Sequence, residues 1–211
     1  MPRMTLIALA LIATTAACAK DGDVSDGGVY VTRSLCPQVG IPAATGDITL
    51  FNPANRTDAG ALDVTAAMTN VQVSCDETGA NVISTATFDV VATRRDASEA
   101  RTVVLPYFDV AMQGGETVAA KRVGQVALNF AAGSTRAQTS GQATIQVNRA
   151  VVTLPADVRA ELLKPRKAGD EEAAIDPMTK PEIRDAVAKA TFEHLIGFQL
   201  TYDQLRYNAT R

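Results

Sequence analysis

The sequence has no tryptophan, one histidine and three cysteines among 211 residues, and only 5% of its residues are aromatic. So few aromatic rings suit plain β-structure better than a carbohydrate-binding platform. A lone histidine has no companion with which to build a histidine metal cluster, and C-x-x-C is absent. The 20 basic and 23 acidic residues are interspersed and give a net charge of −3, which argues against a nucleic-acid-binding surface. We therefore expect no cofactor, no metal and no nucleic acid.

Long hydrophobic runs are also lacking, and the longest apolar stretch covers residues 5–13 near the N-terminus. A transmembrane helix needs roughly 20 apolar residues to cross a bilayer. Here a positive start containing Arg3 precedes the apolar stretch, and small residues at 15–17 lead directly to Cys18. This pattern is typical of a secretory signal peptide over residues 1–17.

The segment that ends at Cys18 resembles the lipobox of bacterial lipoproteins, in which the cysteine is lipidated and becomes the mature N-terminus. The resemblance implies palmitate-type acylation of Cys18. Ala19, rather than Asp, follows this cysteine. By resemblance to the sorting rules of Gram-negative lipoproteins, this implies the periplasmic face of the outer membrane. The whole layout resembles uncharacterised Gram-negative envelope lipoproteins. Two alternatives stay open: cleavage after Ala19 to give a secreted protein, and retention of the apolar stretch as an anchor.

Residues 18–28 are acidic, contain glycine and have almost no apolar side chains, so they are expected to form a flexible tether behind the lipid. If Cys18 carries lipid, Cys36 and Cys75 remain as an even pair. Outside the cytoplasm such a pair predicts a disulfide. A redox-active or metal-binding pair is the alternative.

From residue 29 to residue 154 the sequence alternates between β-prone segments and turn signals, which predicts an antiparallel β-sandwich, immunoglobulin-like or fibronectin-like in outline. The parity of the apolar positions switches between Met68 and Val71, which predicts a bulge or a crossing between the sheets. Gly114-Gly115 predicts a tight hairpin, and Pro106 predicts an edge position or a bulge. The expected strands cover residues 29–35, 47–52, 61–75, 81–94, 101–112, 116–130 and 138–154.

Residues 155–211 are expected to form a C-terminal helical segment and tail packed on the sandwich. A short helix opens at Pro155 and ends before Pro165. A capping box formed by Thr179 and Glu182 is expected to start a second helix that runs to about Phe198. The apolar stripe of this helix is Ile183, Val187, Ala190, His194 and Phe198, and it should dock on the sandwich.

The candidate functional residues each have a structural alternative. His194 is either a general base, for a hydrolase that would recruit a serine from the β-region, or a buried structural histidine on the helix stripe. The carboxylates of residues 170–172 and Asp176 are either a cation site or a solvated loop. The C-terminal tail is either a partner contact, because aromatic and arginine side chains are typical of protein interfaces, or packs onto the sandwich. The tail residues concerned are Tyr202, Leu205, Arg206 and Tyr207.

No G-x-S-x-G elbow, H-E-x-x-H or glycine-rich phosphate loop occurs in the sequence, so no catalytic residues are predicted. The sequence favours a non-enzymatic lipoprotein that faces the periplasm and acts as a binding or accessory subunit with an envelope protein partner. The first alternative is a carrier of an apolar ligand or lipid, held between the sheets or under the C-terminal helix. The second is a hydrolase that uses His194.

Overall fold

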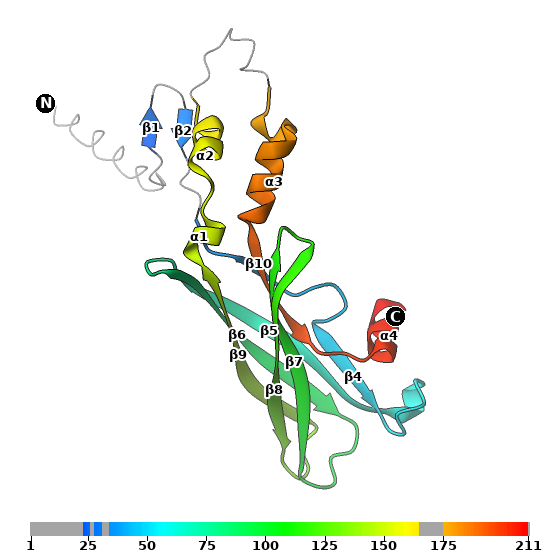
Figure 1. Ribbon diagram of the computed structural model, residues 1–211. Helices are drawn as coiled ribbons and strands as arrows, with labels where there is room; N and C mark the ends of the chain where they lie inside the picture. The colour runs from blue at the N-terminus through cyan, green and yellow to red at the C-terminus, as the bar shows by residue number, and fades with distance from the viewer. Residues whose placement is uncertain (1–22, 26–27, 31–33, 165–174, 211) are drawn as a thin grey trace, which may run out of the picture.

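The computed structural model describes residues 23–25, 28–30, 34–164 and 175–210. It is mainly β, with two four-stranded sheets that face each other as a sandwich-like fold (Figure 1). This confirms the fold class predicted from the sequence. The predicted signal peptide, Cys18 and most of the tether lie outside the described residues, as do the carboxylates at 170–172.

The first sheet is entirely antiparallel and has the order β4-β5-β6-β9. Its strands are β4 (Asp47–Phe51), β5 (Leu62–Asp76), β6 (Asn81–Arg94) and β9 (Arg136–Asn148). Alternation of apolar and polar side chains turns one face of each strand toward the other sheet.

The second sheet has the order β3-β10-β7-β8. Its strands are β3 (Gln38–Gly40), β10 (Phe192–Phe198), β7 (Arg101–Gln113) and β8 (Thr117–Phe130). Strand β3 pairs in parallel with β10, whereas the other two pairings are antiparallel. The chain thus enters this sheet early, at β3, and completes it only near the C-terminus.

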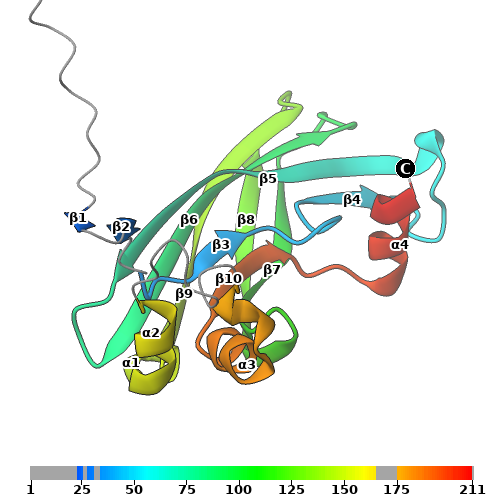
Figure 2. The ribbon, with the colours of Figure 1, turned by 90° about the horizontal axis from the view of Figure 1, so that it is seen from above.

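Short elements surround the two sheets. Helices α1, α2 and α3 gather at one end of the sandwich, and α4 lies beside β4 (Figures 1 and 2). These elements are the hairpin β1 (Asp23–Ser25) and β2 (Gly28–Tyr30), the 3₁₀ turns η1 (Ala59–Ala61) and η3 (Pro177–Thr179), and the helices α1 (Arg149–Val152), α2 (Ala156–Leu162), α3 (Pro181–Lys189) and α4 (Tyr202–Thr210).

The core between the sheets consists of two apolar clusters. The larger cluster contains Phe88, Leu105 and Phe130. The smaller one, toward α1, contains Val82, Ile145 and Phe192, among others. Burying a side chain of this size contributes about 1.5–3 kcal/mol, so the two clusters hold the sheets together.

Several local predictions are confirmed. The register of β5 against β6 shifts between Thr69 and Gln72, and Asn70 there has φ of 50°, so the parity switch is a bulge. Gly114 and Gly115 form the β7–β8 turn with φ of 64° and 75°, values that glycine adopts without strain. Cys36 and Cys75 are joined in a disulfide.

The helix predicted to run to about Phe198 is wrong beyond Lys189, because residues 192–198 form β10. Phe192, His194, Ile196 and Phe198 alternate along β10 and are all buried. A spacing of two residues is the period of a strand, and the position of this segment in the middle of a sheet favours the strand over the predicted helix. The region after residue 154 therefore supplies a central strand of the sandwich, together with helices.

Three smaller expectations are also wrong. The capping box does not form, because the N-cap of α3 is Lys180, whose side chain makes no capping bond, while Thr179 donates to the Asp176 carbonyl. Strand β9 ends at Asn148 rather than at 154. Strand β7 is not an edge strand, yet Pro106 lies beyond the last residue of β7 that pairs with β10, so its missing N–H removes no bond from that ladder.

Candidate functional site

A buried polar trio lies between the two apolar clusters of the core. Ser84 comes from β6, Asp109 from β7 and His194 from β10, so the trio links the two sheets. The Ser84 Oγ lies 3.0 Å from His194 Nδ1, and His194 Nε2 lies 3.1 Å from Asp109 Oδ1. The structure thus brings together a serine, a histidine and a carboxylate that are far apart in the sequence.

The two contacts of His194 fit one tautomer of its ring. With the hydrogen on Nε2, that nitrogen faces the Asp109 carboxyl group, and Nδ1 accepts the hydroxyl proton of Ser84. The Nε2–H and Asp109 Oδ1 are close but are not aligned as a hydrogen bond. Their interaction is therefore mainly electrostatic.

Asp109 is also anchored to the edge of the opposite sheet. Its Oδ2 accepts the backbone N–H of Thr144 at 3.1 Å and lies 3.9 Å from Arg122 Nε. Arg122 donates to the Thr144 carbonyl, and the Tyr107 hydroxyl donates to the Gln142 carbonyl at 2.7 Å. Side chains from β7 and β8 therefore occupy backbone groups along the edge of β9.

Burial decides what the trio can do chemically. Ser84 and His194 have no exposed surface, and Asp109 is 7% exposed. A nucleophile and its base must reach a reacting atom at about 3 Å, with room beside it for stabilising donors. A closed packing of this kind provides no such room. The trio is a structural link between the sheets, which agrees with the alternative reading of His194 as a buried histidine.

We expect Asp109→Asn to destabilise the fold by about 2 kcal/mol, because the amide loses the negative charge that faces His194 and weakens the bond to the Thr144 N–H. Urea unfolding followed by circular dichroism measures the loss. Combining Asp109→Asn with His194→Gln should cost less than the sum of the single changes, since both residues belong to one network. Strict additivity would contradict the proposed coupling.

Tyr107 provides a pH-dependent test of the same cross-sheet contact. Partial burial raises the pKa of the Tyr107 phenol above its usual value, and the negative charge of Asp109 raises it further. A raised folded pKa means that the contribution is complete below the unfolded pKa, near 10, and is lost as the pH rises through the folded pKa. Between pH 8 and pH 11 the wild type should therefore lose more stability than Tyr107→Phe. Equal losses in urea unfolding would contradict this assignment.

A groove of about 690 Å³ crosses the sheet β4-β5-β6-β9. Asp47 pairs with Ala67, Ala67 with Val91, and Val91 with Gln138, so these four residues form one row across the sheet. The side chains of this row face away from the core, because the residues before and after each of them along its strand point inward. The groove is lined by Asp47, Ile48, Thr65, Ala66, Ala67, Val91, Ala92, Thr93, Arg136, Ala137 and Gln138.

Helix α4 is fixed against the strand that forms one side of the groove. The Asn208 amide donates to the carbonyls of Ala44 and Asp47 at 3.0 and 2.8 Å. The Tyr207 ring meets the Phe51 ring edge-on, with centroids 5.1 Å apart. Of the predicted contact residues, Tyr207 therefore packs on the sandwich.

The remaining predicted contact residues lie on the exposed side of α4. Tyr202 is 78% exposed and Leu205 is 41% exposed, and Arg206 pairs with Asp203 at 3.2 Å. Their role in partner contact stays a prediction.

Asp176 caps the turn η3 by accepting the Met178 N–H.

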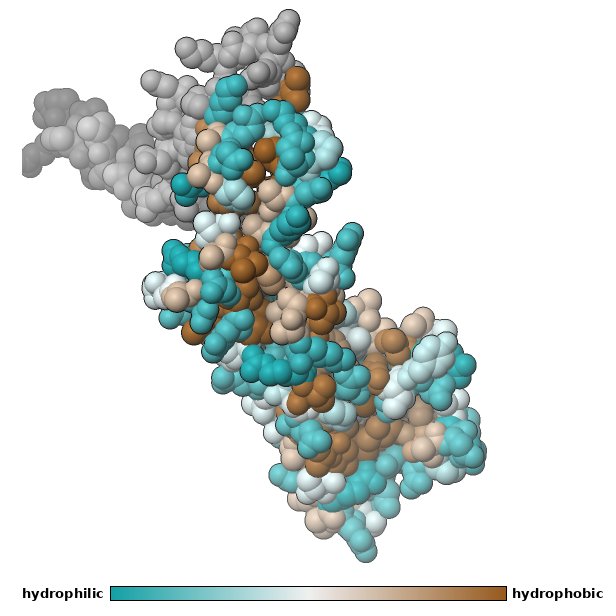
Figure 3. Space-filling model, viewed as in Figure 1, coloured by the Kyte–Doolittle hydropathy of each residue, from teal (hydrophilic) through white to brown (hydrophobic). Residues whose placement is uncertain are grey.

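Within the described residues, no group of three His, Cys, Asp or Glu side chains is arranged to hold a metal ion. No helix in that part of the chain is long and apolar enough to cross a membrane. On the face shown in Figure 3, apolar residues form patches that are interrupted by hydrophilic ones.

The fold and the site define a mainly β protein with a sandwich-like core, a buried polar link and an open groove. In comparisons with known proteins, no family model matches this chain, and neither a curated protein nor a solved structure matches it.

Proposed function

We propose that this protein is a non-enzymatic lipoprotein, anchored through Cys18 on the periplasmic face of the outer membrane, that binds another component of the cell envelope. The observation that carries this proposal is a contrast in accessibility. The described part of the chain holds its serine, histidine and aspartate trio inside the core, whereas an open groove crosses the outer side of one sheet.

Two further features support an envelope location. Cys18 follows an apolar N-terminal stretch in the manner of a lipobox. The disulfide between Cys36 and Cys75 is typical of proteins that fold in an oxidising compartment. The oxidised pair leaves Cys18 as the one cysteine of the chain outside that bond.

The groove is the binding surface that we propose for the envelope partner. It combines the small apolar side chains Ala67 and Val91 with the hydroxyl groups of Thr65 and Thr93, and Arg136 lies at one end. Clefts that bind partners or ligands commonly join an apolar lining to a few polar groups.

A photoreactive amino acid at Gln138, in the groove, tests this surface inside cells. We expect it to cross-link to one discrete envelope protein, and the same residue at Thr102 on the opposite sheet to give no such product. Equal products from both positions, or no product from Gln138, would contradict a groove-bound partner.

The apolar lining of the groove also favours the second candidate function, a carrier of an apolar ligand. The ligand site of such a carrier differs from the one expected from the sequence. The groove lies on the outer side of a sheet, whereas the side chains of Ala66, Ala86 and Ala92 are buried in the packed core. Native mass spectrometry of the protein extracted from membranes tests the carrier hypothesis. A stoichiometric lipid that is lost in Val91→Arg would support it, and absence of any bound mass would exclude it.

A further inference from the structure

We propose that the free edge of strand β8, at Thr117–Val123, accepts an acidic β-strand from a protein partner. This inference deepens the proposed binding role and rests on it, but it concerns a surface distinct from the groove.

Three of the four sheet edges are protected. The side chains of Tyr107, Asp109 and Arg122 occupy backbone groups of β9. The Asn208 amide binds the carbonyl of Asp47 in β4. Strand β3 has only three residues. Very short strands and covered backbone groups are common ways to prevent unwanted strand pairing.

The first half of β8 has weaker protection, namely a bulge between Val118 and Ala120 and the charge of Lys121. All residues from Thr117 to Val123 are exposed, and Val118 and Val123 expose 55% and 56% of their surface. Within the described residues, no hydrogen bond joins the backbone of this segment to any strand other than β7. Toward the helices, β9 runs to α1 while the β7–β8 hairpin ends beside α3 (Figures 1 and 2), so β8 and β9 separate there.

The register shows which backbone groups of β8 point outward. The Pro106 carbonyl accepts the Gln199 N–H, so the backbone of Pro106 faces the β10 side and away from β8. Its partner Gln125 therefore directs its own N–H and C=O away from β7, as in any antiparallel pair that is not hydrogen-bonded. Alternation along β8 gives Val123 and Lys121 the same orientation. A new strand would pair with these groups.

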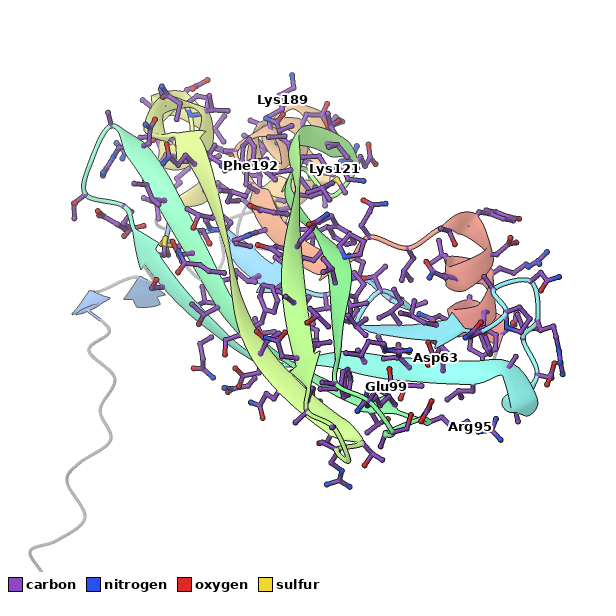
Figure 4. All side chains as sticks on the ribbon, turned by 90° about the horizontal axis from the view of Figure 1, so that it is seen from below. Asp63, Arg95, Glu99, Lys121, Lys189 and Phe192 are labelled. Atoms are coloured by element: carbon purple, nitrogen blue, oxygen red, sulfur yellow. A yellow bond between two sulfur atoms is a disulfide. The ribbon has the colours of Figure 1, made fainter. Side chains whose placement is uncertain are left out.

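The charge of the edge indicates the chemistry of its partner. Strand β8 has two basic residues and no acidic one. The Arg122 side chain turns toward Asp109 and the Thr144 carbonyl, so Lys121 supplies the charge at the open edge. Lys189 of α3 lies at the same end of the molecule as Lys121 (Figure 4), and the backbone of Lys189 is bound by Gln113 at 2.7 Å. A second copy of the same edge would bring like charges together, whereas an acidic strand would pair oppositely charged side chains across the ladder. Strand addition uses main-chain bonds for affinity and side chains for specificity.

The test uses the full chain in detergent and a ten-residue peptide of alternating valine and glutamate, with the matching valine–lysine peptide as control. We expect the acidic peptide to slow amide hydrogen exchange at Lys121 and Val123, and the basic peptide to leave it unchanged. Val123→Pro removes an outward N–H without affecting the β7 ladder, so it should abolish binding.

Lys121→Glu should weaken binding of the acidic peptide about tenfold, because it reverses the charge that faces the peptide. Arg95→Glu makes the same charge change at the opposite end of the molecule from Lys121 (Figure 4), outside the groove, and should leave binding unchanged. Binding of both peptides alike, or of neither, would overturn the proposal. So would self-association that Val123→Pro abolishes, since the occupant would then be a second copy. None of these results affects the membrane anchor at Cys18, which is tested separately.

Discussion

Replacing Arg94 with methionine should destabilise the protein by about 4 kcal/mol. Arg94 is 5% exposed, and its guanidinium donates to the carbonyls of Glu99, Ala131 and Ser134 at 2.6–2.9 Å. Its charge also lies 5.0 Å from the centre of the Phe130 ring. Each hydrogen bond to a charged group contributes about 1.5–3 kcal/mol, and methionine would leave the buried carbonyls without donors.

The effect of Arg94→Met should concentrate at one end of the sandwich. The carbonyls that bind Arg94 belong to the β6–β7 and β8–β9 connections, and Glu99 and Arg95 lie at this end (Figure 4). Hydrogen exchange should rise first in these two connections. The control is Arg95→Met, since Arg95 is exposed and its side chain donates to the carbonyls of Ala59 and Gly60, outside these two connections. A loss in urea unfolding no larger than that of the control would contradict the organising role of Arg94.

Removing the disulfide should also cost about 4 kcal/mol. Cys36 and Cys75 are 39 positions apart, and the chain-entropy model gives this value for a closed loop of about 40 residues. The double variant Cys36→Ser/Cys75→Ser should unfold at lower urea than the oxidised wild type, and the wild type with reductant should match the variant. Cys18→Ser, which leaves the bond intact, is the control. A loss below about 1 kcal/mol would show that the unfolded chain is already constrained in this region.

The strands of the sandwich were largely predictable because a half-buried strand alternates polar and apolar residues. Strand β6 has the predicted bounds, residues 81–94, and the bulge in β5 followed from its parity switch. Strand β10 was missed because His194 and Phe198 fit a helical stripe as well as an alternation. Only its pairing with β7, a non-local contact, decides between the two.

The buried trio was only partly predictable. The sequence singled out His194 as the one histidine, but the residues that pair with it depend on how the two sheets are placed. Ser84 lies 110 positions away in the chain. One signal was present, since Ser84 and Asp109 occupy inward positions of otherwise apolar alternations, where an unpaired polar group would be costly. That signal predicts a buried polar partner and leaves its identity open.

The groove could not be read from the sequence, because it depends on the register of four strands and on where α4 packs. The residues of α4 were expected either to pack or to contact a partner. Tyr207 packs against Phe51, while Tyr202 remains 78% exposed. One short helix thus has a packed side and an exposed side. The amino-acid composition of the tail does not predict which residues lie on which side.

We propose that acyl chains on Cys18 hold this sandwich at a membrane. The most direct measurement is the intact mass of the protein extracted from the membrane fraction, compared with the location of a Cys18→Ser variant. We predict a chain that begins at Cys18 and carries the added mass of fatty acids, and a variant that leaves the membrane fraction. An unmodified mass, or a Cys18→Ser variant that stays equally membrane-bound, would contradict the claim.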